Sequence, residues 1–181
     1  FQGYGEKGGQ DPVDRWHAAY EGEVRAWNFH LPVSPFRTIT GQPSLKGKVL
    51  CDMLDVFRKE QDVFSETGGI HAAGLFGADG SLLMLSEDVG RHNAVDKLIG
   101  AASVKLGLPL NQSVMVVSGR AGFELVQKAS VTGVAIFAAV GAPSSLAVEL
   151  AEETGMTLVG FLKESGMNIY SGAERIVLDE L

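Results

Sequence analysis

The alternation of apolar and polar residues predicts helices and strands over most of the chain after residue 48. Residues 48–64 carry one stripe of side chains at helical spacing, apolar except for Gln61: Leu50, Leu54, Phe57, Gln61 and Phe64. Two short apolar runs follow at residues 70–76 and 81–85, and the Asp79-Gly80 pair between them suits a tight turn. We therefore expect a helix followed by an antiparallel β-hairpin.

Further along, apolar runs without polar alternation predict buried strands at residues 113–117, 134–140 and 157–162. Helical patterns precede or separate these strands: residues 93–106, residues 123 to the stop at Gly133, and residues 146–153. Asn93 is the expected N-cap of the first of these helices, and Glu124 and Lys128 are the expected i, i+4 pair of the second. Residues 163–172 are expected to form a loop.

Alternating strands and helices of this kind imply an α/β fold with three layers: a mostly parallel sheet with an antiparallel hairpin, and helices on both faces. We expect this core domain to span residues 49–181. Residues 1–48 are glycine-rich at the start and broken by prolines further on, so they form a poorly defined N-terminal segment. Because the sequence begins at Phe1 rather than Met, we expect this segment to be incomplete.

Charge and cysteine content narrow the function classes. The formal net charge of -7 argues against nucleic-acid binding by bulk electrostatics. The single cysteine, Cys51, excludes an internal disulfide and any multi-cysteine zinc site, and it fits a reducing compartment. No apolar run approaches the roughly 18 residues of a membrane span, and the start lacks a signal-peptide pattern. We expect a cytoplasmic protein without a metal site, a nucleic-acid partner or a membrane partner.

Polar or glycine-rich loops follow the predicted strands at residues 86–93, 118–122, 141–145 and 163–172. Such turns lie along one edge of a parallel sheet, where helix N-termini present free N–H groups to anions. Ser118-Gly119-Arg120 is the best phosphate candidate, because glycine lets the backbone approach closely, serine offers a hydroxyl and arginine a bidentate fork. A purely structural turn is the alternative; the companion loops favour binding.

The turn that begins with Glu87 and Asp88 also carries Arg91 and His92. The residues alone support two interpretations equally. Arg91 and His92 bind a ligand, or they pair with Glu87 and Asp88 in a cluster that only caps the helix. His71 lies in a strand pattern beside two alanines, which favours a structural histidine with satisfied hydrogen bonds.

Five short motifs occur in order along the last two-thirds of the chain: residues 67–73, 87–94, 118–120, 142–144, and 160–161 leading to 168–170. In sequence and spacing they resemble the formate dehydrogenase accessory sulfurtransferase family, often called FdhD. The resemblance implies a core similar to the cytidine deaminase fold, a homodimer, and binding of a guanine nucleotide. It strengthens the ligand-binding interpretation of Arg91 and His92.

The resemblance also implies a role. Members of the family are sulfur carriers that receive sulfur from a cysteine desulfurase and pass it to the molybdenum bis-guanine-dinucleotide cofactor, which enters formate dehydrogenase. GDP would mimic the nucleotide part of that cofactor. The family's cofactor-binding segment carries over onto the following residues of this sequence: Phe161, Leu162, Lys163, Glu164, Ser165 and Gly166.

One departure from the family concerns cysteine. The family holds its persulfide on a Cys-x-x-Cys loop upstream of the Gly-Gly-x-His motif, whereas Cys51 stands alone in a helical pattern and is better explained as a small, partly buried apolar residue. We assign no catalytic residue; either that loop is missing from these residues, or the protein is a cofactor-binding chaperone without sulfur transfer. A zinc deaminase is excluded, because Ala73 stands where the catalytic glutamate is needed.

Overall fold

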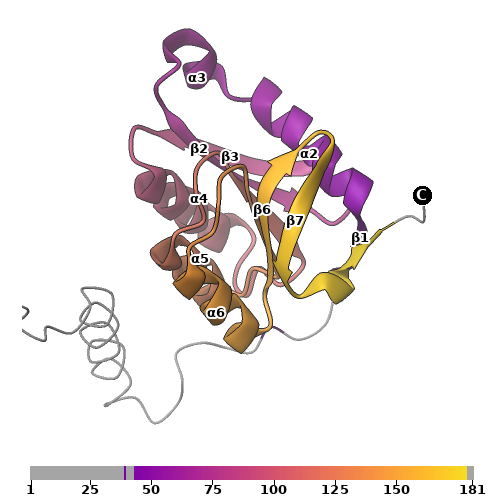
Figure 1. Ribbon diagram of the computed structural model, residues 1–181. Helices are drawn as coiled ribbons and strands as arrows, with labels where there is room; N and C mark the ends of the chain where they lie inside the picture. The colour runs from indigo at the N-terminus through magenta and orange to yellow at the C-terminus, as the bar shows by residue number, and fades with distance from the viewer. Residues whose placement is uncertain (1–38, 40–42, 179–181) are drawn as a thin grey trace, which may run out of the picture. The chain divides into compact units, whose positions relative to one another are not determined.

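The computed structural model describes Ile39 and residues 43–178 (Figure 1), and the predictions made for residues 1–38 lie outside this part. Its elements are, in chain order, β1 (Leu45–Lys46), α2 (Gly47–Lys59), α3 (Asp62–Thr67), β2 (His71–Gly77), β3 (Leu82–Asp88), α4 (Arg91–Lys105), β4 (Ser113–Val117), α5 (Phe123–Val131), β5 (Ile136–Ala139), α6 (Ser145–Thr154), β6 (Thr157–Lys163), β7 (Gly166–Ser171), the 3-10 helix η1 (Ala173–Arg175) and β8 (Ile176–Val177).

Six strands form one sheet in the order β3-β2-β4-β5-β6-β7. The predicted hairpin is confirmed as β2 and β3, and the three predicted buried strands are β4, β5 and β6, which pair in parallel. The sheet as a whole is mixed, because β2 is antiparallel to β4 as well as to β3, and β7 is antiparallel to β6. Parallel pairing is therefore confined to the centre of the sheet.

Helices cover both faces, so the expected three layers are present (Figure 1). Helices α4, α5 and α6 lie on one face and α2 on the other. Helix α2 packs closely because β2 carries Gly74 beneath it: a Cβ atom at Gly74 would lie 2.9 Å from the Phe57 ring. Ile39 and Leu45 are also buried in the core, ahead of residue 49.

Two predicted helix boundaries are wrong. The helix expected over residues 48–64 ends at Lys59, and α3 starts after Gln61, whose side chain donates to the Phe57 carbonyl oxygen at 3.0 Å. The second is the start of α4, at Arg91 with Gly90 as N-cap instead of Asn93. The Asp88 carboxylate accepts from Gly90 N and Asn93 Nδ2 at 3.0 Å each, so it orders the turn before α4, and the Asn93 side chain binds Asp88 instead of capping the helix.

Two other local predictions are also wrong. Residues 163–172, expected as a loop, contain β7, because β6 offers it a partner strand. The expected Glu124–Lys128 pair does not form: Lys128 Nζ lies 2.8 Å from Asp96 Oδ2 on α4, and Glu124 faces His92. Side chains on α5 find partners on the neighbouring helix instead of along their own.

Candidate functional site

The carboxyl ends of β4, β5 and β6 meet at one edge of the sheet, beside the start of β2 and the end of β3. Backbone hydrogen bonds join the loops that leave these strands. Gly141 N donates to Gly119 O at 2.9 Å, and Phe161 N donates to Gly141 O at 3.2 Å. The structure thus brings the 118–122 and 141–145 loops together with the start of the 160–166 segment.

Glycines allow this close approach. A Cβ atom at Gly160 would lie 2.7 Å from Pro143 Cδ and 3.0 Å from the Tyr170 ring. The next residue, Phe161, adopts a φ of 52°, a left-handed conformation that is costly for an aromatic residue, and its side chain is 40% exposed. The chain therefore holds Phe161 in a strained conformation at the surface of the strand-end loops.

The two acids of the Glu87–Asp88 pair are engaged in structural hydrogen bonds. The Glu87 carboxylate accepts from Val63 N and Phe64 N at 3.0 Å each, at the N-terminus of α3. Asp88 Oδ2 lies 2.7 Å from Lys97 Nζ, and this contact, together with the Gly90 and Asn93 donors, lowers the pKa of Asp88 to about 2. These acids order the turn, as the capping interpretation requires, but their partners are not Arg91 and His92.

Arg91 and His92 are neighbours in sequence, but their side chains contact different parts of the molecule. Arg91 is exposed and makes no ion pair with any described residue, and its Cδ atom lies 3.8 Å from where a Cβ on Gly119 would be. His92 instead faces α5, with its Nδ1 atom 3.3 Å from Glu124 Oε2. Of the two, Arg91 lies beside the Ser118-Gly119-Arg120 loop, and His92 belongs to the contact between α4 and α5.

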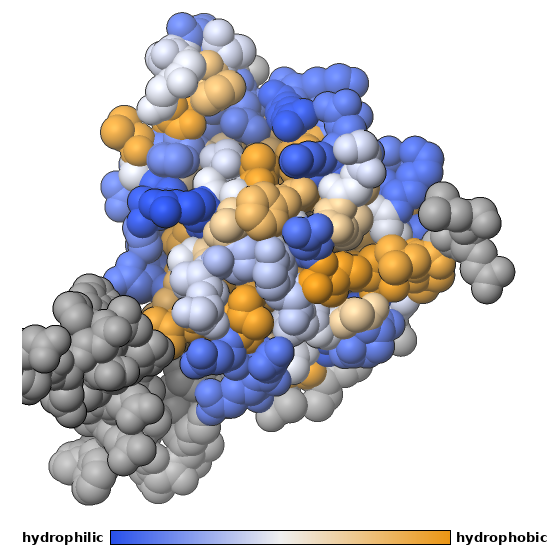
Figure 2. All heavy atoms as spheres, in the orientation of Figure 1, coloured by the Kyte–Doolittle hydropathy of each residue, from blue (hydrophilic) through white to orange (hydrophobic). Residues whose placement is uncertain are grey.

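Two more cations at this edge lack an acidic partner within the part of the chain that the structure describes. They are Arg120, whose Cγ atom lies 2.9 Å from where a Cβ on Gly141 would be, and Lys163 near the end of β6; both are exposed. The molecular face in Figure 2 shows hydrophilic residues interleaved with several separate apolar areas, so no single apolar surface covers it. On a chain with a net charge of -7, three cations along this edge that have no acidic partner among the described residues favour an anionic ligand.

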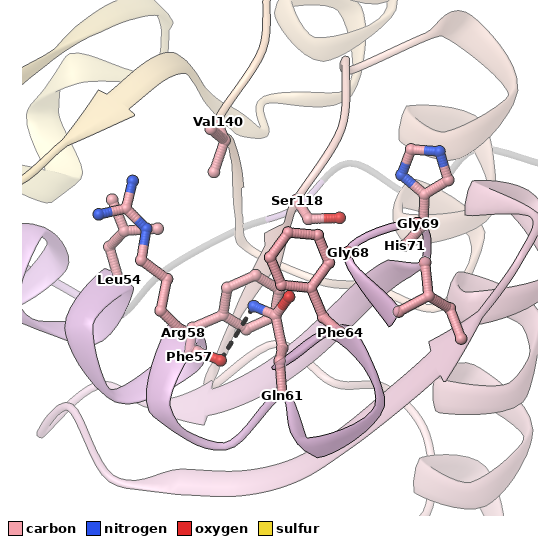
Figure 3. Close-up of a pocket in the computed structure, with 11 residues that line it drawn as sticks. Leu54, Phe57, Arg58, Gln61, Phe64, Gly68, Gly69, His71, Ser118 and Val140 are labelled. Carbon is pink, nitrogen blue, oxygen red and sulfur yellow. Dashed lines mark hydrogen bonds between the residues drawn. The ribbon is translucent and has the colours of Figure 1, made fainter. Parts of the chain in front are cut away.

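A cavity of about 430 Å³ opens beside these loops. In Figure 3 the rings of Phe57 and Phe64 lie between the Arg58 guanidinium on one side and the His71 imidazole on the other. The remaining lining residues are Leu54, Gln61, Gly68, Gly69, Ile70, Ser118 and Val140.

Polar groups in this cavity are few. Gln61 is 5% exposed, and because its Nε2 donates to Phe57 O at 3.0 Å, its Oε1 is left as an acceptor. Ser118 Oγ accepts from Ala72 N at 2.9 Å, so the hydroxyl holds the strand start and can still donate. The His71 ring is half-buried and makes no hydrogen bond among the described residues, so a structural histidine with satisfied hydrogen bonds stays a prediction.

The segment assigned by resemblance to cofactor binding forms the β6–β7 hairpin. Leu162 is fully buried, so its side chain belongs to the core and cannot contact a ligand. Glu164 Oε1 lies 2.7 Å from Arg58 Nη1. Ser165 is exposed in the turn, and Gly166, with a φ of 149°, begins β7.

Cys51 lies on α2 with a side chain that is 9% exposed, and burial raises the pKa of its thiol. A thiol of raised pKa is a poor nucleophile at neutral pH. The structure therefore favours the packing role for Cys51.

The sequence patterns did not identify Arg58 or Gln61 as candidate site residues, because their neighbours in the cavity come from distant parts of the chain.

Comparison with known proteins identifies the group to which this site belongs. The model of the FdhD/NarQ family matches residues 23–177. The chain belongs to this family. A sulfur carrier protein FdhD from Streptomyces coelicolor is 60% identical over 131 residues, which are 72% of this chain and 46% of the relative. The corresponding protein from Mycolicibacterium paratuberculosis is 54% identical over 144 residues, 80% of this chain and 53% of the relative.

A solved structure supports the same fold. A crystal structure assigned as a formate dehydrogenase accessory protein from Desulfotalea psychrophila matches with a TM-score of 0.71 and 30% identity, covering 78% of this chain and 60% of that one. The present chain spans about half the length of the curated FdhD relatives it matches. Among the described helices, none is long and apolar enough to cross a bilayer.

Proposed function

We propose that this FdhD/NarQ chain binds the nucleotide part of a molybdenum bis-guanine-dinucleotide cofactor, as cargo, at the strand-end edge of its sheet. The observation that carries the proposal is a set of exposed cations along the strand-end edge of an acidic chain that have no acidic partner among the described residues: Arg91, Arg120 and Lys163. Relatives named as sulfur carriers and a structural neighbour assigned as a formate dehydrogenase accessory protein support this cargo.

The chemistry of the site fits such a ligand. Arginine guanidinium groups bind phosphate oxygens in bidentate fashion, and Gly119 leaves room for a phosphate beside the backbone. The adjoining cavity combines apolar and aromatic walls with the Gln61 acceptor, which suits a flat ring that carries N–H donors. The cations would hold the diphosphate, and the cavity is the place for a ring of the ligand.

In the complete protein, we propose that this binding serves sulfur transfer. A cysteine desulfurase would supply the sulfur, the cofactor would receive it, and apo-formate dehydrogenase would receive the cofactor from a homodimer in the cytoplasm. The relationship of the core to the cytidine deaminase fold is part of the same proposal. Arg91, Arg120, Lys163 and the backbone near Phe161 are the groups of this chain that would hold the cargo.

A second function is a cofactor-binding chaperone without sulfur transfer, and the burial of Cys51 favours it for the residues described. Incubation with a cysteine desulfurase and cysteine, followed by intact mass measurement, separates the two. A gain of one sulfur atom on Cys51 would restore the carrier role to this thiol. No gain supports binding alone for this chain.

Calorimetric titration with GDP tests the binding site. Arg120→Ala should weaken binding about tenfold or more, about 1.4 kcal/mol. Lys105→Ala is the matched control, because Lys105 is an exposed cation at the C-terminal end of α4, and it should leave the affinity unchanged. Absence of GDP binding by the folded native chain, or equal binding by Arg120→Ala, would contradict the proposed site.

A further inference from the structure

Arg58 is the single arginine or lysine among the side chains that line the cavity. It lies in the last turn of α2, and its Nη1 atom is 2.7 Å from Glu164 Oε1 in the β6–β7 turn, 106 residues further along the chain. The two side chains are 51% and 64% exposed. This ion pair therefore links the helix that walls the cavity to the hairpin that follows the strand-end loops.

We infer that Arg58 is a further anion-binding residue of this site, and that Glu164 holds it while no ligand is bound. The inference rests on the proposed binding of a phosphorylated ligand. When that ligand binds, an oxygen of its phosphate replaces the Glu164 carboxylate as the partner of the Arg58 guanidinium. Glu164 then acts as a competitor of the ligand and not as a contact to it.

The charge of Glu164 supports this assignment. A carboxylate in direct contact with a diphosphate would repel it, yet Glu164 lies within the segment that the family resemblance assigns to cofactor binding. Its contact with Arg58 resolves that conflict, because the acid neutralises a cation that the ligand needs. The other cations of the edge, Arg91, Arg120 and Lys163, have no such partner among the described residues.

The exchange of partners costs little. Ion pairs between exposed side chains contribute weakly to stability, because water competes with both groups. A diphosphate offers the guanidinium oxygens on two phosphorus atoms, and its total charge is larger than that of a single carboxylate. The aliphatic stem of Arg58 lies beside Leu54 and Phe57 in Figure 3, so the guanidinium can change partner while the stem remains packed.

The alternative is that the ion pair only fastens the hairpin to α2. The two explanations predict opposite signs for Glu164→Gln. A fastening role predicts that the variant loosens the hairpin and leaves ligand affinity unchanged or lower. A competing role predicts that the variant frees Arg58 and binds the phosphorylated ligand more tightly.

The experiment measures the dissociation constants of GDP and guanosine for four proteins: native, Glu164→Gln, Arg58→Ala and the double variant. We expect Glu164→Gln to bind GDP about threefold more tightly, and Arg58→Ala to bind it about tenfold more weakly. In the Arg58→Ala background, Glu164→Gln should have no further effect. Guanosine lacks phosphate, so neither substitution should change its affinity.

Asp52→Asn is the matched control. It removes the carboxylate of another exposed ion pair of α2, in which Lys48 Nζ lies 2.9 Å from Asp52 Oδ1, and it changes the net charge by the same amount. A similar gain in GDP affinity for Asp52→Asn would reduce the effect of Glu164→Gln to general electrostatics and overturn the inference.

The outcomes distinguish the inference from the function on which it rests. If the native chain binds GDP and Glu164→Gln binds it no better, the inference fails and the proposed function stands. A gain that is equal for guanosine, or one that persists without Arg58, also overturns the inference. If none of the four folded proteins binds GDP, both fail.

Discussion

Two arginines at opposite edges of the sheet show how differently the same residue type is used. Arg175, on η1, is 7% exposed, and its guanidinium donates to Gly155 O at 2.8 Å and to Ile39 O at 3.1 Å. Arg120, at the strand-end edge, is exposed and makes no ion pair with any residue in the described part. The comparison teaches that satisfied hydrogen bonds mark an arginine that holds the fold together, whereas an unpartnered arginine is available to a ligand.

The largest effect should come from Arg175→Met. Removal of the guanidinium leaves the Ile39 and Gly155 carbonyl oxygens without their donor in a buried setting, so we expect the free energy of unfolding to fall by about 2–4 kcal/mol. Urea denaturation measures this change. The remaining folded protein should bind GDP with native affinity, and Arg120→Met should show the reverse pattern: native stability and weakened GDP binding. Equal losses of stability in the two variants would contradict the assignment of Arg175 to the fold and of Arg120 to ligand binding.

Gly160→Ala should destabilise the strand-end loops by about 1–3 kcal/mol, because the added methyl group meets Pro143 and the Tyr170 ring and must push them apart. Gly100→Ala is the matched control: this exposed position within α4 has nothing within 4 Å of the new Cβ. That substitution should stabilise the chain by about 0.5–1 kcal/mol through helix propensity. Thermal unfolding of the two variants should therefore shift in opposite directions.

Glu87→Gln tests whether the acidic turn is structural. The variant loses the charge at the N-terminus of α3, and an amide bonds two backbone N–H groups less well than a carboxylate, so a loss of about 0.5–1 kcal/mol is expected. Amide hydrogen exchange should become faster at Val63 and Phe64, whose N–H groups bind Glu87. Unchanged exchange at both amides would show that Glu87 does not hold α3.

Elements with a strong local signal were predicted correctly from the sequence. The β4 strand is apolar after Ser113 because it is buried on both faces, and α6, predicted over residues 146–153, spans Ser145–Thr154 and ends at Gly155, which takes the left-handed conformation. The clustering of the strand-end loops also followed from topology alone. Each of these conclusions depends on neighbours in sequence or on a general rule of parallel strands.

What the sequence could not predict depends on partners far along the chain. Strand β7 exists because β6 accepts it, and its residues are only partly buried, so they carry little apolar signal. Arg58 lies outside the stripe at helical spacing over residues 48–64, and neither Glu164 nor the cavity is visible in its local pattern. The contacts of Asp88 are an exception: its partners Gly90 and Asn93 lie only two and five residues away, but the helical pattern pointed to Asn93 as a cap and not as a donor to Asp88.

The smallest expected effect is the pH dependence that Asp88 gives to stability. Its pKa is lowered from 3.8 to about 2 by Lys97 first, and then by the Gly90 and Asn93 donors. A carboxyl whose pKa is lower in the folded than in the unfolded chain stabilises the fold above the unfolded value, and this contribution is lost as the pH falls through the folded value. The stability difference between the native chain and Asp88→Asn should therefore be constant near neutral pH and shrink between about pH 4 and pH 2.

Urea denaturation across that pH range measures this stability difference. In a Lys97→Met background the difference should be smaller at every pH, because the main cause of the lowered pKa is gone. A difference that does not change with pH would mean that Asp88 stabilises the turn before α4 through its hydrogen bonds alone, without a contribution from its charge.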